Sequence, residues 1–211
     1  MRESRATDFG SVAVRVPPAE RGQRIGLLGG SFNPPHAAHR MISQAALKRL
    51  GLDAVWWLVS PGNPLKSREG EAALPQRVAL AEAMADDARI RVTDFEQRLP
   101  TPYTAATLAF LRRRRPGVKF VWLMGADNLA TFHRWRNWRG IFHLMPIAVI
   151  DRPGWHLKAL ASPAARAFAS ARWPEARALR LAAAPAPAWT LLSGPLSELS
   201  STALRIQARK Q

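Results

Sequence analysis

The sequence predicts an α/β domain with a mostly parallel sheet flanked by helices. Short apolar runs typical of buried strands alternate with longer stretches whose apolar residues recur at helical spacing. The connections are long enough for the right-handed crossovers that join parallel strands. The chain has 211 residues, of which 47% are hydrophobic, so it can bury the core of one such domain.

Six apolar runs have the length and composition of strands. The fourth stops just before Gly125, and the last is the weakest. The third alternates apolar with polar side chains, which is typical of a half-buried or edge strand. The expected strands cover residues 24–28, 54–60, 90–95, 119–124, 147–150 and 189–192.

Three stretches between these runs have helical periodicity. The first, residues 38–50, ends at Gly51, a usual residue just past a helix. The second, residues 75–86, begins with proline, which is tolerated in the first turn. The third, residues 104–115, stops before a proline that cannot continue a helix.

The remaining segments decide the domain organisation. Residues 1–23 predict a polar N-terminal tail, and residues 24–211 a single domain without internal repeats. Residues 155–188 are rich in Ala, Arg and Pro and carry little strand signal. We expect one helix over residues 155–171 and an irregular connection after it.

Composition excludes several classes of function. The chain has no cysteine, which excludes disulfides, thiolate metal sites and cysteine nucleophiles and permits the cytoplasm, where we expect the protein. No apolar run approaches the roughly 20 residues of a membrane helix, and residues 1–23 lack the apolar centre of a signal peptide. The net charge of +16 favours an anionic partner, although an arginine-rich genome explains it equally well.

The stretch of residues 29–39 carries most information about function. A buried strand precedes Gly29 and Gly30, which predict a turn, and two histidines, His36 and His39, follow where a helix begins. Glycines let backbone amides approach a phosphate, and a helix N-terminus favours an anion. Asn33 precedes a proline and is therefore expected to be extended. We interpret the stretch as a phosphate site; a structural turn with two surface histidines is the alternative.

Two other stretches add polar groups. Ser200, Ser201 and Thr202 precede a helical run in which Arg205 falls near the first turn. A cation is poorly placed there unless an anion lies between it and the amides, so we expect phosphate binding as an alternative to an ordinary helix cap. Asp127 follows the strand that ends at residue 124, where it can accept ribose hydroxyls or cap the next helix.

Residues 30–39, Gly-Ser-Phe-Asn-Pro-Pro-His-Ala-Ala-His, resemble a signature of the adenylyltransferase branch of the nucleotidyltransferases, with Ala38 in place of a usual glycine. Residues 199–205 resemble the family's second signature, Ile-Ser-x-Thr-x-x-Arg, and Gly125-Ala-Asp127 its Gly-x-Asp contact. The resemblance implies a Rossmann-like nucleotidyltransferase fold. It also implies contacts with ATP at these positions: Gly29, Gly30, Ser31, Phe32, His36, His39, Gly125, Asp127, Ser200, Ser201, Thr202 and Arg205.

Two further segments, residues 101–108 and 127–138, are similar to stretches of the nicotinate-nucleotide adenylyltransferases that hold the pyridine nucleotide. Lys66 matches a lysine of that family, although Leu65 replaces a histidine before it. The resemblance implies that nicotinate mononucleotide contacts Asn33, Lys66, Tyr103, Thr104, Trp135 and Arg136. The Trp135 ring can stack on the nicotinate ring, and Arg136 suits an acid better than its amide; Trp138 is expected in the core.

The reaction that this resemblance implies is adenylyl transfer from ATP to nicotinate mononucleotide, giving deamido-NAD and pyrophosphate. His36, His39, Lys66 and Arg205 are the expected catalytic residues. Mg²⁺ should enter with ATP, without a dedicated protein metal site. Partners other than these substrates are not expected, neither nucleic acid nor membrane, and the sequence says nothing about oligomeric state. The alternatives are an adenylyltransferase for nicotinamide mononucleotide or phosphopantetheine, a nucleotide sensor without turnover, and a basic nucleic-acid-binding protein.

Overall fold

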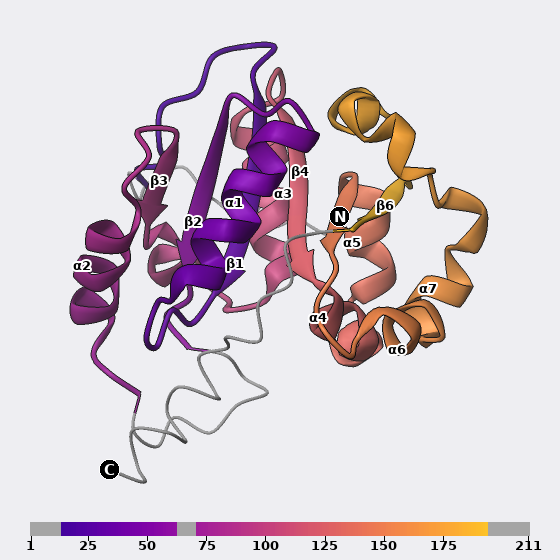
Figure 1. The fold of residues 1–211 in the computed structure, drawn as a ribbon. Helices are drawn as coiled ribbons and strands as arrows, with labels where there is room; N and C mark the ends of the chain where they lie inside the picture. The colour runs from indigo at the N-terminus through magenta and orange to yellow at the C-terminus, as the bar shows by residue number, and fades with distance from the viewer. Residues whose placement is uncertain (1–13, 63–70, 194–211) are drawn as a thin grey trace, which may run out of the picture.

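In the part of the chain that the structure describes, a parallel sheet of six strands forms the centre of the molecule (Figure 1). The computed structural model describes residues 14–62 and 71–193. The strand order is β3-β2-β1-β4-β5-β6, and every neighbouring pair is parallel, as the alternation of elements predicts. The strands are β1 (Arg24–Gly30), β2 (Ala54–Val59), β3 (Ile90–Thr93), β4 (Lys119–Gly125), β5 (Ile147–Ile150) and β6 (Trp189–Leu192).

All six strands lie close to their predicted positions. In β2 every side chain is buried, because helices cover both faces of the sheet. At the edge, β3 is only partly buried and ends at Thr93, earlier than expected. Phe95 instead begins a short 3₁₀-helix, η1 (Phe95–Arg98), and its side chain turns into the core.

The three predicted helices are present as α1 (Ala37–Arg49), α2 (Leu74–Met84) and α3 (Thr104–Arg114). Two short helices, α4 (Ala126–Thr131) and α5 (Trp138–Leu144), were not predicted, and η2 (Phe132–Arg134) joins them. Segments of six and seven residues span at most two helical turns, which is too short for the apolar periodicity to register.

The single helix expected over residues 155–171 is wrong. The segment divides into α6 (His156–Leu160), α7 (Pro163–Ala167) and η3 (Ala169–Ala171). The Ser162 hydroxyl accepts a hydrogen bond from the Ala165 N–H at 3.2 Å and caps α7, whose first residue is a proline. Because proline lacks the N–H that α6 needs to continue, a new helix starts here. The connection expected to be irregular contains a nine-residue 3₁₀-helix, η4 (Glu175–Ala183).

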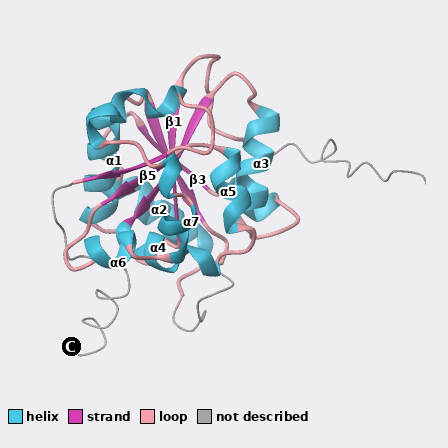
Figure 2. Ribbon diagram, turned by 90° about the vertical axis from the view of Figure 1, so that its right-hand side faces the viewer, coloured by secondary structure: helices cyan, strands magenta, loops and turns pink. Residues whose placement is uncertain are grey.

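Two apolar clusters cover the two faces of the sheet. Buried residues of α1, α2 and η4 form one cluster, and those of α3, α4, α5, α6 and α7 form the other. In Figure 2 the strands fan through the middle of the molecule and helices surround them. Val14, Val16 and Ala19 also pack against the second cluster, so the described end of the predicted tail contacts the domain.

The strand order creates one topological switch point. From β1 the chain crosses through α1 to β2 on one side, and from β3 it returns through α3 to β4 on the other. Neighbouring connections diverge between the carboxyl ends of β1 and β4, where parallel α/β sheets bind ligands. The predicted phosphate loop follows β1 and the Gly125–Asp127 segment begins at the end of β4, so both lie at this switch point. Among the described residues, no helix is long and apolar enough to cross a membrane.

Candidate active site

The two glycines at the end of β1 belong to the strand, and the first of them allows a tryptophan side chain to pack against it. Gly29 and Gly30 are the last two residues of the strand and pair with Leu58 and Val59, so the expected glycine turn is wrong and the turn begins at Ser31. A Cβ atom on Gly29 would lie 2.5 Å from the indole of Trp122. The missing side chain therefore makes room for a tryptophan of β4 beside the site.

The two histidines lie together where α1 begins. His36 is the residue that precedes the first helical residue, and the centroids of its ring and the His39 ring are 3.9 Å apart. The His36 backbone N–H donates to Nδ1 of His39 at 3.2 Å. A neutral His39 must then carry its proton on Nε2, which lies 3.8 Å from a Cβ atom built on Gly30. That nitrogen is therefore directed toward the end of β1.

Phe32 and Asn33 support the loop. The Phe32 side chain is fully buried, stacks on Trp57 and contacts His39, so only its backbone can meet a ligand. Its φ of 48° lies in the left-handed region. The Asn33 side chain is nearly buried, and its Oδ1 accepts a hydrogen bond from the Ala72 N–H at 3.3 Å.

His36 is neutral at physiological pH. Burial and, to a smaller extent, repulsion by Arg152 lower the pKa of His36 from 6.5 to about 4, and attraction by Asp127 limits the fall. Its Nδ1 is buried and has no hydrogen-bond partner within residues 14–62 and 71–193. A buried polar nitrogen without a partner costs stability, which a ligand that accepts or donates a hydrogen bond there recovers.

Asp127 lies in the first turn of α4 and pairs with an arginine that sequence analysis missed. Arg152 Nη1 lies 3.0 Å from Asp127 Oδ2, and both side chains are largely buried. A Cβ atom on Gly125 would lie 2.3 Å from Asp127 Oδ1, so this glycine leaves space for the carboxylate. That oxygen has no hydrogen-bond partner in the described part of the chain. The one sequence signal for Arg152 is its place just after β5, at the same edge of the sheet.

The segments assigned to the pyridine ring lie close together. The Arg136 guanidinium lies over the Tyr103 ring, 4.6 Å from its centroid. Tyr103 precedes the first residue of α3, Thr104. Trp135 is half-buried against Phe132, and its ring centroid lies 6.4 Å from that of Trp122.

Trp122 thus links the two predicted subsites, since its other edge packs beside Gly29. Trp138 is partly buried in the core against Phe142 and Phe168, as predicted. Some predicted site residues lie outside the described residues: Lys66, Ser200, Ser201, Thr202 and Arg205.

The arrangement is chemically suited to an anion at the switch point. The two imidazoles supply hydrogen-bond donors, and Arg152 supplies a further donor and positive charge. Asp127 supplies an acceptor. The described ranges contain no group of three His, Asp or Glu side chains that could hold a metal ion. The donor set therefore favours a phosphate with nearby ribose hydroxyls over a bare metal.

Comparisons with known proteins give a consistent result. The cytidylyltransferase-like family matches residues 27–207. A probable nicotinate-nucleotide adenylyltransferase of Methylorubrum extorquens is 61% identical over 182 residues, which cover 86% of this chain and 98% of that protein. A protein of the same name from Rhizobium meliloti is 58% identical over 181 residues, covering 86% and 96%.

Among solved structures, nicotinic acid mononucleotide adenylyltransferase of Plasmodium falciparum, complexed with NaAD, superposes with a TM-score of 0.65. The match covers 87% of this chain and 83% of that one at 16% identity. At this sequence identity the match shows a shared fold. It agrees with the Rossmann-like nucleotidyltransferase fold that the sequence predicts.

Proposed function

This chain belongs to the nicotinate-nucleotide adenylyltransferases of the cytidylyltransferase-like family, and from this premise we propose that it transfers the adenylyl group of ATP to nicotinate mononucleotide. The products are deamido-NAD and pyrophosphate, so the reaction is a step of NAD biosynthesis. The observation that carries the proposal is the pair of adjoining imidazoles where α1 begins, beside the switch point of the sheet.

The chemistry is a single in-line displacement. An oxygen of the mononucleotide 5′-phosphate forms a bond to the α-phosphorus of ATP, while the bond from that phosphorus to the oxygen bridging to the β-phosphate breaks. The bridging oxygen leaves with the electron pair as part of pyrophosphate. The attacking oxygen is already an anion, so no protein nucleophile or base is required, and catalysis consists of positioning and charge stabilisation.

The donors and charges of the site support such a role. In our proposal the Nε2 proton of His39 and a ring N–H of the neutral His36 donate to phosphate oxygens on which charge grows. Arg152 adds positive charge nearby, and Asp127 accepts from a ribose hydroxyl. Lys66, Ser200, Ser201, Thr202 and Arg205 are proposed as further phosphate contacts from the matching signatures.

The pyridine nucleotide is assigned to the other subsite. Trp135 presents an aromatic ring for the flat nicotinate, and Tyr103 and Thr104 offer donors to its carboxylate from the N-terminal end of α3. Arg136 adds a cation that favours the acid over the amide. Asn33 is proposed to reach the nucleotide from the β1–α1 loop.

Mg²⁺ is inferred to arrive bound to ATP. It prefers phosphate and water oxygens to imidazole nitrogens, so the two histidines fit the phosphates themselves rather than the ion. When bound, the metal neutralises phosphate charge. We treat residues 24–211 as one catalytic domain and infer a cytoplasmic location from the lack of cysteine.

A substrate panel tests the function. Purified protein is incubated with ATP and Mg²⁺ together with nicotinate mononucleotide, nicotinamide mononucleotide or phosphopantetheine, and pyrophosphate release is followed. We expect the highest kcat/KM with nicotinate mononucleotide and none with ATP alone. Equal use of the amide removes the role given to Arg136. Inactivity with every acceptor, combined with tight duplex DNA binding at physiological salt, supports a nucleic-acid-binding protein instead.

A further inference from the structure

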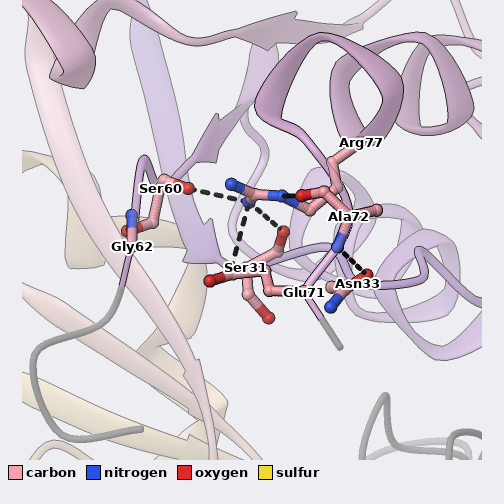
Figure 3. Close-up of polar contacts among 7 residues, drawn as sticks. All are labelled: Ser31, Asn33, Ser60, Gly62, Glu71, Ala72 and Arg77. Atoms are coloured by element: carbon pink, nitrogen blue, oxygen red, sulfur yellow. Dashed lines mark hydrogen bonds and ion pairs between the residues drawn. The ribbon is translucent and has the colours of Figure 1, made fainter. Parts of the chain in front are cut away.

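Arg77 of α2 is a fully buried arginine that contacts the predicted phosphate loop at Ser31, directly after β1. Its side chain is 2% exposed. Figure 3 shows its guanidinium surrounded by backbone carbonyls from three segments. Nη1 donates to Ser31 O at 2.6 Å and to Ser60 O at 2.8 Å, and Nε donates to Ala72 O at 2.9 Å. The Glu71 carboxylate lies 3.6 Å from Nη1.

These acceptors join the two loops at the carboxyl edge of the sheet. Ser31 directly follows β1, and Ser60 directly follows β2. Both hydrogens of Nη1 are used, one for each loop. The segment before α2 is tied in as well, because Ala72 accepts from Arg77 and donates to Asn33 Oδ1 at 3.3 Å. One side chain thus bridges the β1–α1 loop, the end of β2 and the segment before α2.

Two hydrogen bonds, one from Ser60 N and one from Arg77, fix the direction of two successive peptide groups. The Gly30 carbonyl accepts from Ser60 N at 2.9 Å, and the next carbonyl, Ser31 O, accepts from Arg77 beside Ser60. In a trans peptide the N–H points opposite to the carbonyl. The N–H groups of Ser31 and Phe32 therefore point away from β2, toward the side on which β4 lies.

Two successive backbone N–H groups on one side of a loop form an anion-binding concavity, and a left-handed residue such as Phe32 is typical of it. We propose that Arg77 is a positioning residue for polyphosphate: it holds the Ser31–Phe32 peptide so that the Phe32 N–H faces the β1/β4 switch point, beside the Ser31 N–H that the bond from Ser60 N to Gly30 O directs there. The inference rests on the proposed function and deepens it, since it assigns phosphate recognition to a pair of backbone donors, one of which Arg77 orients.

The geometry requires arginine at this position. A guanidinium presents planar, fixed donors that reach several carbonyls at once, whereas a lysine ammonium is a single nitrogen. Arg77→Lys keeps the charge opposite Glu71 but cannot hold all three carbonyls at these distances. The Ser31–Phe32 peptide is then free to rotate, and its N–H no longer faces the phosphates.

The test compares the affinities of wild-type protein and Arg77→Lys for ATP, inorganic tripolyphosphate and adenosine, measured by calorimetry. We expect the variant to lose about tenfold or more in affinity for ATP and tripolyphosphate, the effect of losing hydrogen bonds to charged groups. Adenosine affinity should change less than about twofold, because adenosine has no phosphate and makes none of these bonds. A purely structural role lowers the melting temperature without changing the ratio of ATP to adenosine affinity.

Trp189→Phe is the matched control for stability. Trp189 is buried in β6, and its Nε1 donates to Phe168 O at 2.8 Å, so its loss destabilises the protein away from the switch point. This variant should keep the wild-type affinity ratio at a comparable fall in melting temperature. Should Arg77→Lys not fold, Glu71→Gln removes only the carboxylate 3.6 Å from Nη1 and should shift the ratio in the same direction by a smaller factor.

An unchanged ratio in a folded Arg77→Lys protein, or in Glu71→Gln where that variant replaces it, overturns the inference. The proposed function is tested by a different result from the one that tests Arg77. If the wild type binds tripolyphosphate but releases no pyrophosphate with nicotinate mononucleotide, the reaction assignment is wrong while the positioning role of Arg77 is still decided by the affinity ratio.

Discussion

The two subsites of this molecule are held in different ways. On the phosphate side His36 is 7% exposed, and the loop around it is held by the bond from the His36 N–H to His39 Nδ1 and by the packing of Phe32 on Trp57. On the pyridine side Arg136 is exposed, Tyr103 and Trp135 are half-buried, and the connection between Arg136 and Tyr103 is a cation–π contact of 4.6 Å. The first subsite is therefore preorganised and the second adaptable.

The difference matches the two tasks. Stabilising charge on a reacting phosphate requires donors that do not reorganise during the reaction, which buried and internally bonded groups provide. Holding a flat ring and its carboxylate requires contact area and one or two donors, which surface aromatics supply with some freedom of movement. Substitutions on the phosphate side should lower kcat, whereas those on the pyridine side should raise KM or change specificity.

The largest effect is expected for His39→Ala. The substitution removes the donor directed toward the end of β1 and the acceptor of the His36 N–H. We expect kcat to fall by about 10²–10³, the usual effect of losing one preorganised donor to a transition state. Steady-state kinetics of pyrophosphate release measure it, and circular dichroism checks that the fold is intact. A kcat near that of the wild type would break the comparison between the two subsites.

The pyridine side is tested by Trp135→Ala. Loss of a stacked ring costs about 1–3 kcal/mol, so KM for nicotinate mononucleotide should rise about tenfold or more, with KM for ATP nearly unchanged. Trp138→Ala is the matched control, since Trp138 packs on Phe142 and Phe168 and should lower the melting temperature alone. An equal rise in both KM values would contradict the separation of the subsites.

The sequence predicts the features that depend on residues close together in the chain. The run from β1 to α1 has a short apolar run, glycines and a helix start within 26 residues, Arg24 to Arg49, so its order could be predicted. The parallel sheet follows from the alternation of such runs. The purpose of Gly29 could not be predicted, because the Trp122 ring beside it comes from a strand almost 100 residues away.

The two arginines at the site escaped prediction for a physical reason. Arg77 lies in an ordinary amphipathic-looking helix and binds backbone carbonyls, which every residue type possesses, so no partner residue identifies it. Arg152 follows β5 and pairs with Asp127, which follows the neighbouring strand β4 and is 25 residues away in the sequence. Among 31 basic residues, neither has a local pattern that separates it from a solvated surface cation.

A smaller effect is expected for Arg136→Gln. The guanidinium is exposed and screened by solvent, so its contribution to selecting an acid over an amide should be a few-fold in kcat/KM. The measurement is the ratio of kcat/KM for nicotinate and nicotinamide mononucleotides, at low and high salt. Lys158→Gln, which removes a cation over Trp155 instead, is the control and should leave the ratio unchanged. An unaltered ratio in Arg136→Gln would assign selectivity to Tyr103 and Thr104.

The remaining expected effect concerns stability and pH, and the two subsites contribute with opposite sign. Burial lowers the pKa of His36 from 6.5 to about 4, so between these values the unfolded chain binds more protons and acidification destabilises the fold. Glu96 lies beneath the pyridine side, where its Oε1 accepts from Thr107 of α3 at 2.7 Å. Burial raises the pKa of Glu96 from 4.5 to about 7, so here the folded protein binds more protons and a rise in pH destabilises it.

From pH 4.5 to 6.5 the two contributions oppose each other, and substituting one group reveals the other. Relative to the wild type, Glu96→Gln should lose more stability on acidification, because only the His36 contribution remains. His36→Asn should lose more as the pH rises, because Glu96 alone remains. Urea unfolding at several pH values measures both slopes, and all other carboxylates cancel in the differences. Parallel curves for the three proteins would mean that neither group is held in its buried, neutral form, and the contrast between a preorganised and an adaptable subsite would lose its electrostatic basis.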